Sequence, residues 1–137
     1  WVWSPHISMP WFEYYYPGDD VVDWVGLGIL NYGTVANWSR WWRLEQILDK
    51  AYPTLSRFEK PMMIAELGTL SHGGEILAWY QRAFYHLEHT YGRIRGIIFF
   101  NQPHDVTMSS HPLNWTVGQD PQAAEFVARE LARLSAH

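Results

Sequence analysis

The chain alternates between continuous apolar runs and segments in which apolar residues recur every three or four positions. The continuous runs predict buried strands at 1–4, 21–30, 61–66 and 95–101. The periodic segments predict helices at 38–52, 75–91 and 121–134. Runs that are apolar throughout are typical of parallel strands, so the order strand, strand, helix, strand, helix, strand, helix predicts an α/β fold of parallel (β/α) units.

Two of the predicted helices carry clear boundary signals. The helix at 38–52 should end before Pro53, because proline inside a helix removes a hydrogen bond and clashes with the preceding turn. The last helix has Asp120 as a plausible N-cap and Pro121 in its first turn.

Three predicted strands have a polar residue at or next to their C-terminal end: Asn31 follows the second strand, Glu66 closes the third and Asn101 closes the fourth. The C-terminal ends of parallel strands carry the functional residues of (β/α)8 barrels and of open doubly wound sheets. Neither glycine-rich phosphate-binding motif follows a strand, which argues against a nucleotide-binding open sheet. A barrel is favoured, of which four strands supply half.

Composition narrows the class of partner. Aromatic residues make up 17% of the 137 residues, and the formal net charge is −4 with ten scattered basic residues. Surplus aromatic rings suit sugars, whereas nucleic acid requires clustered Lys and Arg, so polysaccharide is expected and nucleic acid is not. The absence of cysteine excludes disulfides and thiolate metal sites, and His86 and His89 share a helix face without a third ligand, so no metal is expected.

The chain begins on Trp1 without an initiator methionine, and no apolar stretch reaches the roughly 18 residues of a transmembrane helix. We therefore expect residues 1–137 to be one partial barrel domain cut from a longer protein. The N-terminal half of the barrel would come from upstream sequence or from a second chain, because four strands leave two unpaired edges.

Four segments together resemble a known family. They are WVWSP at 1–5, YYPGDDVVDWVGLGILNYG at 15–33, KPMMIAELG at 60–68 and IIFFN at 97–101. In this order they resemble the segments around strands five to eight of glycoside hydrolase family 26. That resemblance implies a (β/α)8 barrel that cleaves a β-linked mannan or glucan without a cofactor. It also favours a secreted or cell-envelope location.

The resemblance assigns Glu66 as the catalytic nucleophile of a retaining mechanism. A second carboxylic acid about 5 Å away would protonate the leaving oxygen. In the family this acid lies on strand four, which would precede Trp1. The chain alone should therefore not catalyse hydrolysis. The residues by themselves leave another interpretation open, in which Glu66 only caps a strand or pairs with an arginine.

Further residues near the strand ends are candidates for sugar contact. Trp and Tyr rings offer a flat apolar face and a polar edge, which suits a pyranose. The predicted substrate-binding set is Trp3, His6, Asn31, Tyr32, Trp38, Phe99, Asn101 and His104.

The sequence departs from the family pattern where Gly28 and Leu30 replace an Asp and a Tyr, the latter a partner of the nucleophile. This departure favours a second hypothesis, a catalytically weakened barrel that binds polysaccharide within a synthesis or export protein.

Overall fold

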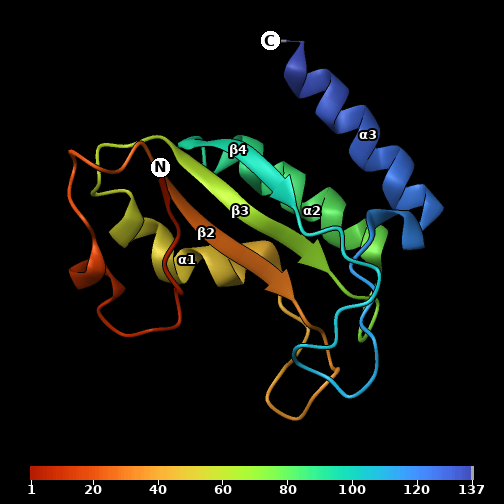
Figure 1. Cartoon of the computed structure of the whole chain (residues 1–137). Coiled ribbons are helices and arrows are strands. Elements are labelled where there is room, and N and C mark those ends of the chain that lie inside the picture. The colour runs from red at the N-terminus through yellow and green to blue at the C-terminus, as the bar shows by residue number, and fades with distance from the viewer. Residues whose placement is uncertain (137) are drawn as a thin grey trace.

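The computed structural model describes residues 1–136 and contains one parallel sheet with three α-helices (Figure 1). The sheet order is β1-β2-β3-β4. The strands are β1 (Val2–Trp3), β2 (Trp24–Asn31), β3 (Met62–Thr69) and β4 (Ile94–Phe99). The helices are α1 (Leu44–Leu55), α2 (Ile76–His89) and α3 (Pro121–Ser135), with 3-10 turns η1 (Phe12–Tyr15) and η2 (Val117–Gln119). The predicted α/β class, element order and parallel pairing are confirmed.

The helices pack on a single face of the sheet, which we call the helix face. Alternate side chains of β2, including Leu27 and Ile29, are fully buried there in one core with Leu48 of α1 and Tyr80 of α2. The opposite face, called the open face, is only partly covered, and Ile98 on it is 53% exposed. Consecutive strand order with helices on one face is compatible with half of a barrel.

Both boundaries of α1 differ from the prediction. Helix α1 begins at Leu44 instead of residue 38, because the backbone N–H of Arg43 donates to the Gln46 side chain and caps the helix there. The helix also continues past Pro53 to Leu55, whose side chain is fully buried in the core. Proline removes a single hydrogen bond near the end of a helix, and burial of the last turn offsets that loss.

Strand β3 also differs, since it continues three residues past Glu66 to Thr69. Glu66 therefore lies inside the strand and does not close it. The predicted start of α3 is confirmed, with the Asp120 carboxylate accepting from the backbone N–H of Gln122 at 2.9 Å and of Ala123 at 3.2 Å.

None of the helices in the described part of the chain combines the length and the apolar character that crossing a membrane requires.

Candidate active site

A β-bulge in β3 determines where Glu66 points. Leu27 of β2 pairs with Ile64, and the next residue, Gly28, pairs with Glu66, so Ala65 is an extra residue in β3. Ile64 and Leu67 are buried in the core on the helix face. Between them, a Cβ at Gly26 would lie 3.3 Å from the Ala65 Cβ, and a Cβ at Gly28 would lie 3.3 Å from Glu66 Oε2. Both intervening side chains therefore lie on the open face.

The Glu66 carboxylate has no structural partner. Its residue is exposed, and within residues 1–136 it accepts no hydrogen bond and forms no ion pair. The interpretation that Glu66 pairs with an arginine is therefore wrong for the described part of the chain. The missing Cβ of Gly28 leaves the space beside Glu66 Oε2 open. A carboxylate in this setting is available to a ligand.

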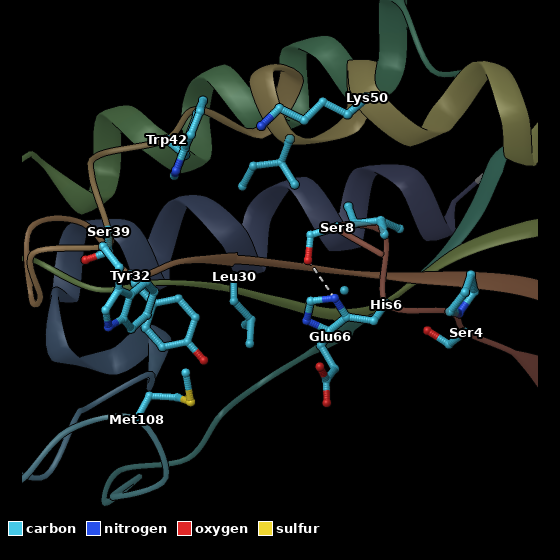
Figure 2. A pocket seen from close by; sticks show the side chains of 15 residues that line it. Ser4, His6, Ser8, Leu30, Tyr32, Ser39, Trp42, Lys50, Glu66 and Met108 are labelled. Carbon is cyan, nitrogen blue, oxygen red and sulfur yellow. Dashed lines mark hydrogen bonds between the residues drawn. The ribbon is translucent and has the colours of Figure 1, made fainter. Parts of the chain in front are cut away.

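Glu66 lines a cavity of about 690 Å³. The other walls come from the segment 4–8, from Gly28 and Leu30 of β2, from the loop that contains Tyr32, Trp38 and Trp42, and from Ile47 and Lys50 of α1 (Figure 2). β1 pairs with β2 only at Trp24 and Val25, so the remaining edge of β2 has no strand beside it. The cavity therefore reaches from the open face at Glu66 to the start of α1.

Three of the predicted substrate-binding residues line this cavity with Glu66: His6, Tyr32 and Trp38. His6 is exposed, and its Nδ1 lies 2.7 Å from the Ser8 hydroxyl. The Tyr32 ring meets the rings of Trp38 at 5.3 Å and Trp115 at 4.8 Å, each in an edge-on arrangement. Burial raises the pKa of Tyr32, and the negative charges of Asp105 and Glu66 add to this effect, so the phenol stays protonated.

Trp3 and Phe99 do not line the cavity, and the prediction that they contact sugar there is not supported. Both side chains pack with the main core on the helix face. The Trp3 ring contacts Tyr16 at 5.0 Å and Phe58 at 5.4 Å, near the N-terminal ends of β2 and β3. The Phe99 ring lies 6.2 Å from Tyr80 of α2. Alternation along each strand places them on this face.

Asn31, Asn101 and His104 are also outside the cavity lining. Asn31 is 0% exposed, and its Oδ1 accepts from the backbone N–H of Trp42 at 2.8 Å while its amide donates to Thr69 at 2.9 Å. Asn101 accepts from the backbone N–H of Val117 at 3.2 Å, and the His104 N–H donates to the Gln102 side chain at 3.4 Å. Asn31 and Asn101 therefore fix loops, which explains polar residues at strand ends without a ligand.

The candidate-site prediction did not include Trp42, Lys50 or Met108, which also line the cavity. Trp42 and Lys50 fall within the segment 38–52 predicted as one amphipathic helix, in which Trp41 was expected in the buried stripe. The structure instead makes residues 38–43 a loop. A sequence signal existed in the two basic residues near Trp42, because Arg and Lys often pack over indole rings. No comparable signal marks Met108.

A second, smaller core supports one end of the cavity. Trp115 is 1% exposed and contacts Tyr32 and Phe100. Its indole N–H donates to the Asp105 carboxylate at 3.0 Å. Hydrogen bonds from Thr107, and that from Trp115, hold the pKa of Asp105 below its usual range. Because the Trp115 ring contacts the Tyr32 ring, this network restricts the position of Tyr32 in the cavity.

Among residues 1–136 no three His, Asp or Glu side chains are grouped closely enough to hold a metal ion. The side chains that line the described cavity offer one carboxylate, one imidazole, one ammonium group, three serine hydroxyls and several aromatic rings.

Fold and site together define an α/β protein with a parallel sheet, helices on one face and a cavity that contains Glu66 at the open face. No protein-family model matches the chain. The chain is 27% identical over 110 residues to Endoglucanase H of Acetivibrio thermocellus. The aligned region covers 80% of this chain and 11% of that protein, so the chain spans about a tenth of its curated relative. The similarity suggests a glycoside hydrolase-like relative.

Proposed function

We propose that the chain is the C-terminal half, strands five to eight, of a (β/α)8 barrel of the family 26 type. Consecutive parallel strands and helices on one face support this assignment. A complete barrel would cover the open face, where Ile98 is exposed, and would pair the free edges of β1 and β4. The remaining strands would come from upstream sequence or from a second chain.

The proposed activity is hydrolysis of a β-linked polysaccharide, mannan or glucan, with retention of configuration. Glu66 would attack the anomeric carbon and form a covalent glycosyl-enzyme. A carboxylic acid from the missing half would protonate the leaving oxygen and then, as a base, activate the water that releases the sugar.

The observation that carries this proposal is the Glu66 carboxylate, exposed in a cavity and without a hydrogen bond or ion pair in the described chain. The position of this carboxylate in a cavity beside aromatic rings, and not its lack of a partner alone, supports a role in ligand binding. The Tyr32 and Trp38 rings beside it offer stacking surfaces for sugar rings. Similarity to an endoglucanase supports a β-linked glucan as one substrate class.

The test uses the full-length protein with Glu66→Gln, and Glu59→Gln as the matched control. Glu59 is exposed and lies outside the cavity lining. Release of reducing sugar from β-glucan and β-mannan should fall about 10³-fold or more with Glu66→Gln and stay unchanged with the control. A 2-deoxy-2-fluoro glycoside should label the peptide that contains Glu66. Equal cleavage by Glu66→Gln and the parent would refute the assignment.

A second candidate function is polysaccharide binding without hydrolysis, within a synthesis or export protein. One observation favours it: Gly28 and Leu30, which stand beside Glu66 in the cavity, supply no hydrogen-bond donor to orient the carboxylate. In this case the parent should bind β-glucan or β-mannan without cleaving it. Glu66→Gln should then leave the binding constant within about twofold.

A further inference from the structure

One wall of the cavity carries a tryptophan flanked by two cations. The Arg40 guanidinium carbon lies 3.8 Å and the Lys50 ammonium nitrogen 4.2 Å from the Trp42 ring centroid. Trp42 and Lys50 both line the cavity that contains Glu66. Figure 2 shows the Lys50 side chain extended along α1 toward the Trp42 ring. The cations and the ring form one assembly, called here the Trp42 shelf (Arg40, Trp42 and Lys50).

The backbone of Trp42 forms hydrogen bonds to two other parts of the fold. Its N–H donates to the buried Asn31 side chain of β2 at 2.8 Å. Its carbonyl accepts from the indole N–H of Trp79 of α2 at 2.7 Å. The ring is therefore fixed against the sheet and against a helix before any ligand arrives, which lowers the entropic cost of binding.

Neither cation of the shelf is neutralised by the described protein. Across residues 1–136, the ion pairs and hydrogen bonds give Arg40 and Lys50 no carboxylate partner. The chain carries 14 acidic and ten basic residues, so acidic partners are in excess elsewhere. By contrast, Arg82 and Arg133 both pair with glutamates. Lys50 therefore gives the cavity wall a positive charge without a counter-charge, and Arg40, which is outside the cavity lining, adds to it from its place on the Trp42 ring.

We propose that the Trp42 shelf is a subsite for a sugar unit that carries a negative charge, so that the glycan bound beside Glu66 is an acidic one. The proposal rests on the proposed function, since it names the substrate class of the same cavity. The sugar ring would bind along the shelf while its anionic group accepts hydrogen bonds from Lys50 and Arg40. A uronic acid carboxylate and a sulfate ester share this chemistry.

The solvent exposure of Arg40 and Lys50 limits how strongly the cavity should prefer a charged sugar over a neutral one. Both cations are exposed, and an exposed ion pair contributes little, so two such pairs together give an affinity gain of about 2- to 30-fold. Salt should reduce this gain, because the Debye length shortens from about 10 Å at 0.1 M to about 3 Å at 1 M.

The test is isothermal titration calorimetry on the full-length protein in a Glu66→Gln background, which prevents cleavage during the titration. Three β-1,4-linked oligosaccharides of equal length serve as probes: a neutral glucan, its oligoglucuronate and its 6-sulfated form. Lys50→Met and Arg40→Met remove one charge each while keeping an apolar stem. Arg57→Met, at an exposed position outside the cavity lining, is the control for net charge.

At low salt at least one charged probe should bind about 2- to 30-fold more tightly than the neutral probe. Lys50→Met and Arg40→Met should reduce this preference, and Arg57→Met should keep it. The charged probe that binds more tightly identifies the preferred anionic group as a uronate or a sulfate. Equal affinity for all three probes, or a preference that survives both substitutions, would overturn the proposal.

The two levels of the hypothesis can fail separately. If the parent cleaves neutral glucan and no charge preference exists, the acidic subsite is wrong and the hydrolase assignment stands. If none of the three probes binds and no glycan is cleaved, both are wrong.

Discussion

Substitution of Gly33 by alanine is the sharpest test of how the cavity loop is held. Gly33 follows β2 and has a φ of 59°, in the left-handed region that favours glycine. An added Cβ would lie 1.7 Å from the backbone oxygen of His72, half of the 3.4 Å at which ordinary contact begins. That oxygen accepts the Thr34 N–H at 2.8 Å, which joins the loop after β2 to the loop after β3.

The magnitude follows from two costs. The left-handed conformation costs an alanine about 1–2 kcal/mol. Relief of the clash moves His72 away from Thr34 and loses a hydrogen bond of about 1 kcal/mol. The sum of about 2–3 kcal/mol corresponds to about a 30- to 140-fold larger population of the opened loop.

Hydrogen-exchange mass spectrometry measures this population directly. In the full-length protein, Gly33→Ala should accelerate exchange in peptides that cover 31–42 and 70–74 by about that factor and weaken glycan binding. Gly92→Ala is the matched control, because a Cβ there meets nothing within 4 Å. Unchanged exchange in Gly33→Ala would refute the contact between the two loops and their role in shaping the cavity.

Two further predictions concern buried polar groups around the cavity. Asn31→Ala should destabilise by about 2–3 kcal/mol in urea unfolding, because it leaves the Trp42 N–H and the Thr69 hydroxyl without their partner, while Asn101→Ala at an exposed position should cost less than about 1 kcal/mol. A small effect of Asn31→Ala would contradict its assigned role. The pKa of Asp105 is lower in the folded chain than when unfolded, so the stability that it contributes is present above about pH 4 and is lost as the pH falls through the folded pKa. Protection against exchange in peptides from 102–119, taken relative to the intrinsic exchange rate at each pH, should therefore fall on acidification below about pH 4, and Asp105→Asn should show reduced protection already at pH 7. Protection in the parent that does not change with pH would count against the Asp105 to Trp115 network.

The sequence predicted the element order because apolar runs and helical periodicity are local signals. It misplaced the start of α1 because the stripe of Trp41 and Leu44 continues the helical spacing across the loop before Arg43. The capping interaction that starts the helix joins Arg43 to Gln46 and is not one of the usual Ser, Thr or Asp signals.

The candidate site was predictable only in part, for a geometric reason. Glu66, His6, Tyr32 and Trp38 meet in one cavity as strand-end reasoning expects. Trp3 and Phe99 lie outside the cavity because a strand end shows where a residue lies along the strand, whereas the face depends on register. Trp42 and Lys50 enter the cavity through a loop that the periodicity concealed.

The bulge at Ala65 explains how an unpartnered carboxylate keeps its orientation. Regular alternation after Ile64 would place Glu66 on the helix face and Leu67 on the open face. An ionised carboxylate among buried apolar side chains costs several kcal/mol, and exposure of Leu67 would forfeit about 1.5–3 kcal/mol of burial. With the extra residue, Leu67 is 0% exposed in the core and Glu66 faces the cavity. Core packing therefore fixes the direction of Glu66, and both of its oxygens stay available to a ligand.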